Sequence, residues 1–110
     1  MTTMTIGESC VRWLKSGTIG VLCDHSLEIV PPRDGAALML LKGWAPRGPD
    51  HGIRAHGVFR LLPSQSHDGR RELAELSAPE REAWLASLGL RAVDQDLGAY
   101  GPRMIAERIA

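Results

Sequence analysis

The spacing of apolar residues along the chain changes between Pro63 and Gly69. Before this point, apolar residues form short runs that Gly and Pro interrupt; after it, they recur at helical spacing behind capping sequences. Short interrupted runs are typical of strands, and spacings of three and four residues are typical of amphipathic helices. The chain is therefore predicted to form a single α+β domain over residues 1–110, with a helix and a sheet in 1–62 and a helical tail in 63–110.

A helix is predicted over residues 6–16. Thr5 and Glu8 have the spacing of a capping box, in which each side chain bonds the other's backbone amide. Gly17 stands where a left-handed residue commonly ends a helix. The helix would turn one apolar face toward the core. This face comprises Ile6, Cys10, Trp13 and Leu14.

Short apolar or β-branched segments predict a small antiparallel sheet of three or four strands. A Pro-Pro-Arg-Asp-Gly turn at 31–35 separates two of them. By composition the segment 36–42 fits a helix as well as a strand; we interpret it as a strand because glycines bound a run of strand length. The expected strands are 18–23, 27–30, 36–42 and 58–62.

The tail after Pro63 predicts helices that cover one face of this sheet, since strands this short need such a cover. The strongest signal is a second capping box, Ser77 to Glu80, before an apolar stripe that includes Trp84. Gly89 then supplies the expected stop. The expected helices are 69–76, 78–88, 91–97 and a last one that Pro102 opens, with Ile105 and Ile109 facing inward.

Residues 44–57 hold three Gly and two Pro and predict one long loop. Long loops in compact domains are often functional. An aromatic side chain closely followed by arginine is typical of an interface anchor. The expected partner-binding residues are Trp44, Arg47, His51, Arg54 and His56.

Charge and motifs favour a non-enzymatic function. The formal net charge is zero, whereas domains built to coat nucleic acid are usually strongly basic. No Gly-Lys-Ser/Thr phosphate loop and no dinucleotide-binding glycine motif occurs. The function predicted is a small protein-binding or regulatory module that uses the 44–57 loop to contact another protein.

Two alternatives from other classes stay open. Three tail helices could form a DNA-binding regulator, with Arg70, Arg71 and Arg81 on the phosphate backbone. A small hydrolase or nuclease could use His51 and His56 as acid and base, although no nucleophile is identifiable. A homo-oligomer could form by pairing of sheet edges.

The cysteines do not predict a metal site, and no cofactor is expected. Cys10, Cys23 and His25 are the ligand types that zinc prefers, but Cys10 and Cys23 are too far apart for a ligand pair. The longest apolar run, Ala36–Leu41, has six residues, against about 20 for a membrane span. With no basic and apolar leader at the start, a cytoplasmic protein without membrane attachment is expected.

Overall fold

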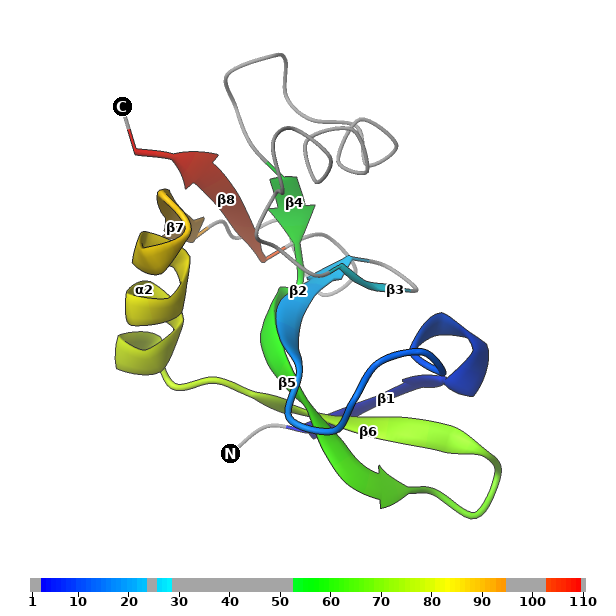
Figure 1. The fold of residues 1–110 in the computed structure, drawn as a ribbon. Coiled ribbons are helices and arrows are strands. Elements are labelled where there is room, and N and C mark those ends of the chain that lie inside the picture. The colour runs from blue at the N-terminus through cyan, green and yellow to red at the C-terminus, as the bar shows by residue number, and fades with distance from the viewer. Residues whose placement is uncertain (1–2, 24–25, 29–52, 95–102, 110) are drawn as a thin grey trace.

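The chain folds mainly into antiparallel sheet. The computed structural model describes residues 3–23, 26–28, 53–94 and 103–109, and within these ranges it contains eight strands and one α-helix (Figure 1). The helix is α2 (Ala78–Ser87), and a short 3-10 helix, η1 (Glu8–Cys10), follows the first strand. The strands are β1 (Thr3–Gly7), β2 (Ile19–Cys23), β3 (Ser26–Glu28), β4 (Ile53–Ala55), β5 (Gly57–Gln65), β6 (Arg70–Glu75), β7 (Leu90–Asp94) and β8 (Met104–Arg108).

Two sheets share these strands. The larger has the order β1-β6-β5-β2-β3 and the smaller the order β4-β8-β7, with every neighbouring pair antiparallel. The predicted α+β architecture with an N-terminal helix and a helical tail is therefore wrong. β1 and η1 stand where the helix 6–16 was expected, and β6, β7 and β8 replace three of the four expected tail helices.

β6 shows why helix propensity misled the prediction. Its residues, Arg-Arg-Glu-Leu-Ala-Glu, are good helix formers. In the fold they lie between β1 and β5, and Leu73 and Ala74 are both buried although they point to opposite faces. A strand in mid-sheet can bury two successive residues in this way, so tertiary packing overrides local propensity.

The larger sheet carries a core on each face. One core, the helix-side core, lies between this sheet, the smaller sheet and α2, whereas the other, the loop-side core, lies under the segment between β1 and β2. The helix-side core comprises Val21, Cys23, Ala55, Val58, Leu76, Leu85, Leu90, Met104 and Ala106. The loop-side core comprises Ile6, Val11, Leu22, Leu27, Phe59, Leu61 and Leu73.

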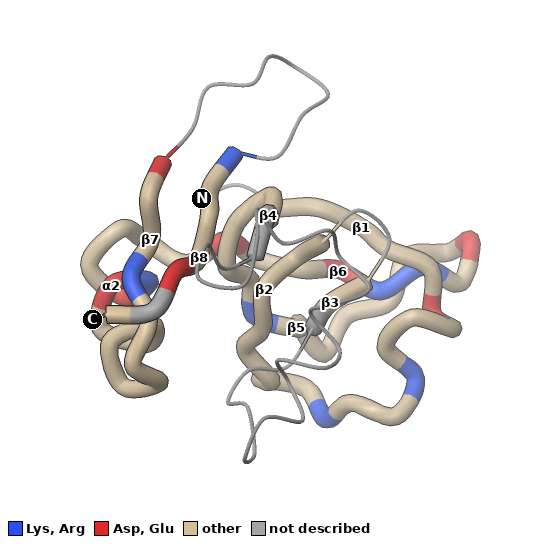
Figure 2. Tube along the Cα trace, turned by 90° about the horizontal axis from the view of Figure 1, so that it is seen from above, with Lys and Arg blue, Asp and Glu red and all other residues tan. Residues whose placement is uncertain are grey.

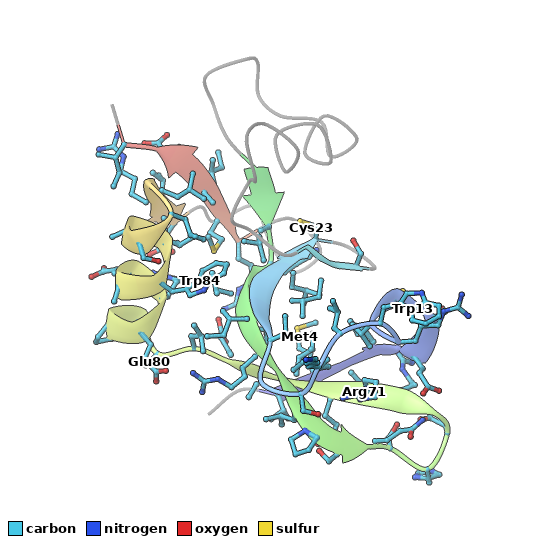
Figure 3. All side chains as sticks on the ribbon, viewed as in Figure 1. Met4, Trp13, Cys23, Arg71, Glu80 and Trp84 are labelled. Atoms are coloured by element: carbon cyan, nitrogen blue, oxygen red, sulfur yellow. The ribbon has the colours of Figure 1, made fainter. Side chains whose placement is uncertain are left out.

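α2 confirms the helix predicted at 78–88. Ser77 caps it, since the Ser77 hydroxyl accepts a hydrogen bond from the Glu80 amide at 3.4 Å. Gly89 ends it with φ +74°, a conformation that favours glycine. Leu85 is fully buried and Trp84 is partly buried against the helix-side core; Trp84 points from the helix toward the sheets (Figure 3).

One continuous stretch of chain joins the two sheets. β4 pairs in the smaller sheet and β5 in the larger, with only His56 between them. The His56 amide donates to the Leu22 carbonyl at 2.7 Å, which fixes the crossing point against β2. Gly57 follows with φ +144°, a backbone conformation that is unfavourable for any residue with a Cβ atom.

We expect Gly57→Ala to lower the free energy of unfolding by about 2–3 kcal/mol, because strained backbone and a displaced core side chain add together. A Cβ at Gly57 would lie 3.1 Å from the Phe59 ring, which is itself buried. Gly69→Ala is the matched control: Gly69 has φ +83° but nothing within 4 Å, so about 1 kcal/mol is expected. Urea unfolding measures both, and equal losses would contradict a crowded crossing at Gly57.

Candidate recognition surface

The segment between β1 and β2, residues 8–18, forms a projecting loop, which we call the Trp13 loop. It is anchored from below, because Val11 is 1% exposed in the loop-side core and Leu14 packs partly buried against the same core. Its remaining long side chains face outward. In Figure 2 the loop runs outside the sheets and carries basic positions along its length.

Backbone hydrogen bonds hold the Trp13 loop in one shape. Turn bonds of 2.9, 3.0 and 3.1 Å join groups three residues apart within it. At its end the loop extends the pairing of β2 with β5, since the Gly17 amide donates to Leu61 O at 2.7 Å and the Leu61 amide donates to Thr18 O at 2.8 Å. The loop is therefore tied to the central strand of the larger sheet.

Trp13 is the most exposed large apolar side chain among the described residues, at 83%. The Arg12 guanidinium carbon lies 4.8 Å from the centre of its ring, a cation–π distance. Trp13 lies on the side of the molecule away from α2 and Trp84 (Figure 3). The prediction that Trp13 packs in the core is wrong, and so is the inward position expected for Cys10, which is exposed.

Arg71 links the Trp13 loop to an irregularity in β5. The pairing of β5 with β6 shifts register between Leu61 and Gln65, a stretch that contains Pro63, which has no amide to donate. One Arg71 guanidinium nitrogen donates to the Leu62 carbonyl in this bulge at 2.9 Å, and to the Ser16 hydroxyl at 3.4 Å. Arg71 thus supplies a hydrogen-bond donor to the Leu62 carbonyl and links the Trp13 loop to the bulge in β5.

Charge around Trp13 is mostly positive. Within the described part of the chain, Arg12, Lys15 and Arg71 form no ion pair with a carboxylate. The Glu8 carboxylate accepts from the Gln65 amide at 3.1 Å. Glu72 lies on the opposite face of β6 from Arg71, because side chains alternate along a strand, and accepts from Ser64 at 3.0 Å.

The turn between β5 and β6 holds the one group described with a clearly shifted pKa. The Ser66 hydroxyl donates to the Asp68 carboxylate, and this hydrogen bond holds the pKa of Asp68 below its ordinary value of 3.8. A carboxyl group with a lowered pKa is a poor proton donor at neutral pH. The Asp68 carboxylate also accepts from the Arg70 amide at 3.3 Å, so it helps to hold the turn.

The predicted contact residues fall mostly outside the described part of the chain. Trp44, Arg47 and His51 lie there, as does His25. Arg54 lies on β4 opposite Ile105 of β8, within the stretch expected to be loop. His56 is half-buried at the crossing from β4 to β5, so a loop continuous over 44–57 is wrong at its end.

The candidate metal ligands do not form a centre where they are described. Cys23 is buried in the helix-side core, whereas Cys10 is exposed on η1. No group of three His, Cys, Asp or Glu side chains suited to a metal occurs among the residues with described positions. Cys23 behaves as a small apolar core residue.

Comparison with known protein families, curated proteins and solved structures finds no match for this chain. Among the described helices, none has the length and apolar character needed to cross a bilayer.

We expect Arg71→Met to loosen the Trp13 loop, because the Leu62 carbonyl and the Ser16 hydroxyl would lose their donor. The expected loss of stability is about 1–2 kcal/mol, with faster hydrogen exchange of the Gly17 amide. Arg70→Met is the control: within the described part of the chain, the exposed Arg70 side chain donates one hydrogen bond, to the Thr5 carbonyl at 3.2 Å, so less than about 0.5 kcal/mol is expected. An unchanged Gly17 exchange rate in Arg71→Met would show that Arg71 does not hold the loop.

Proposed function

We propose that this protein is a small non-enzymatic protein-binding or regulatory module, with the Trp13 loop as one contact surface. One observation carries the proposal: Trp13 is 83% exposed on a loop that is held in place by hydrogen bonds, by the buried Val11 and by the partly buried Leu14. An ordered, exposed tryptophan pays little entropy on binding and offers a large apolar area. Binding would remove this area from water.

The surface predicted at 44–57 stays a second proposed contact region. It rests on the sequence pattern of Trp44 followed by Arg47, with His51 and Arg54 nearby. Trp13 also has an arginine beside it, but here the arginine, Arg12, precedes the tryptophan in the sequence and lies over its ring. The two regions make the same kind of proposal, recognition by an aromatic side chain with an adjacent cation.

The DNA-binding alternative loses its basis. It required helices at 69–76 and 91–97, and these segments contain β6 and β7. Arg81, one of its proposed phosphate contacts, pairs instead with Asp94 at 3.3 Å, joining α2 to β7. No other described observation favours a tail that enters a DNA groove.

The test is quantitative capture of partners from a lysate of the native host with wild-type protein and with Trp13→Ala. We expect Trp13→Ala to weaken capture of a specific partner by about 2 kcal/mol, roughly 30-fold. Its thermal stability should stay close to wild type, because the side chain is exposed.

Ile109→Ala is the matched control, since Ile109 is a 51% exposed apolar residue directly after β8. It should capture the same partner as wild type. Equal capture by wild type, Trp13→Ala and Ile109→Ala would contradict a role for the Trp13 loop in binding.

A further inference from the structure

The Trp13 loop has an apolar centre and a positive rim. The indole of Trp13 is the apolar centre, and Arg12 and Lys15 are exposed beside it in the sequence. Arg71 adds a third charge beneath the loop through its bond to Ser16. Arg12 and Lys15 are exposed and pair with no carboxylate in the described part of the chain, so their charge is available to a partner. Arg71 is part-buried and bonded to Leu62 and Ser16, so it contributes only to the local positive potential.

The position of Arg12 leaves donors for an anion. Its guanidinium carbon lies over the Trp13 ring, 4.8 Å from the ring centre, and a cation–π contact with one ring leaves N–H donors of the group for other partners. A guanidinium held in this way is preorganised, so less side-chain entropy is lost when it binds a carboxylate. The loop thus offers one apolar contact and charge-assisted hydrogen bonds within a short reach.

This chemistry fits an acidic protein segment better than a nucleic acid. The surface provides a single aromatic ring and a few cations on a chain with zero net charge, whereas nucleic-acid domains present basic stripes that neutralise many phosphates. An acidic segment with one apolar side chain would require one apolar contact, which Trp13 provides, and a few positive charges, which Arg12 and Lys15 provide. Complementary charge would speed its encounter and select against basic partners.

We propose that the Trp13 loop binds an acidic protein segment, whose apolar side chain packs on Trp13 while its carboxylates contact Arg12 and Lys15. This inference rests on the proposed function, since it names the chemistry of the partner at the same surface.

The experiment measures fluorescence anisotropy of three labelled probes with the 110-residue chain. The probes are a short peptide of glutamate and leucine, the same peptide with lysine in place of glutamate, and a deoxythymidine oligonucleotide. The glutamate peptide should bind best, and its affinity should fall as salt rises. Trp13→Ala should lower this affinity at least about 30-fold.

Charge reversals separate the two proposals. Arg12→Glu and Lys15→Glu should each weaken the glutamate peptide about fivefold to tenfold, because an exposed attraction becomes a repulsion. Arg103→Glu makes the same change in net charge at an exposed arginine just before β8, and it should have little effect. Lys15→Glu keeps the cation–π contact between Arg12 and Trp13, so it tests charge apart from the aromatic contact.

The inference is overturned if the glutamate peptide does not bind, if Arg12→Glu and Lys15→Glu behave like Arg103→Glu, or if the oligonucleotide binds more tightly. If Trp13→Ala loses the native partner while both charge reversals retain it, the proposed function stands and the acidic partner does not. If Trp13→Ala retains the native partner, the Trp13 loop has no role in binding, and the acidic-partner inference fails with it.

Discussion

Burial on both faces of the larger sheet is the constraint on which the rest of this structure depends. Successive residues of β5 serve different cores, since Val58 belongs to the helix-side core and Phe59 to the loop-side core. Each buried side chain of this size contributes about 1.5–3 kcal/mol. Exposed ion pairs such as Arg60–Glu80, at 3.2 Å, contribute about 0–1 kcal/mol. The position of α2 and of the Trp13 loop therefore follows from the apolar residues they cover.

The shape of the candidate recognition surface follows from this arrangement and from Pro63. The loop-side core needs a cover, and Val11 and Leu14 of the Trp13 loop provide it. Pro63 lies where the pairing of β5 with β6 is irregular. At this bulge one guanidinium nitrogen of Arg71 donates hydrogen bonds to the Leu62 carbonyl and to the Ser16 hydroxyl. The contacts of Val11, Leu14 and Arg71 thus fix the loop in a position in which Trp13 is exposed to solvent beside Arg12 and Lys15.

Part of this fold could be predicted from the sequence. α2 was predictable because the Ser77 cap, the stripe containing Leu85 and the Gly89 stop agree with one another, and the strands around Val21 and Phe59 were predictable from their β-branched and apolar runs. β6 was not, because its helix formers become a strand only through neighbours distant in sequence. Trp13 was misplaced by the helix 6–16, although Thr3, Thr5 and Ile6 before Gly7 are residues that favour a strand.

The cores of the larger sheet hold the Trp13 loop so that Trp13 is exposed beside Arg12 and Lys15. Quenching of tryptophan fluorescence by iodide and by caesium, compared between wild type and Trp13→Phe, measures this exposure and the sign of the surrounding charge. An exposed indole beside Arg12 and Lys15 should be quenched more strongly by iodide than by caesium, and Trp13→Phe should remove this component. Iodide quenching that is unchanged in Trp13→Phe would show that Trp13 is shielded from solvent and that the loop does not present it outward.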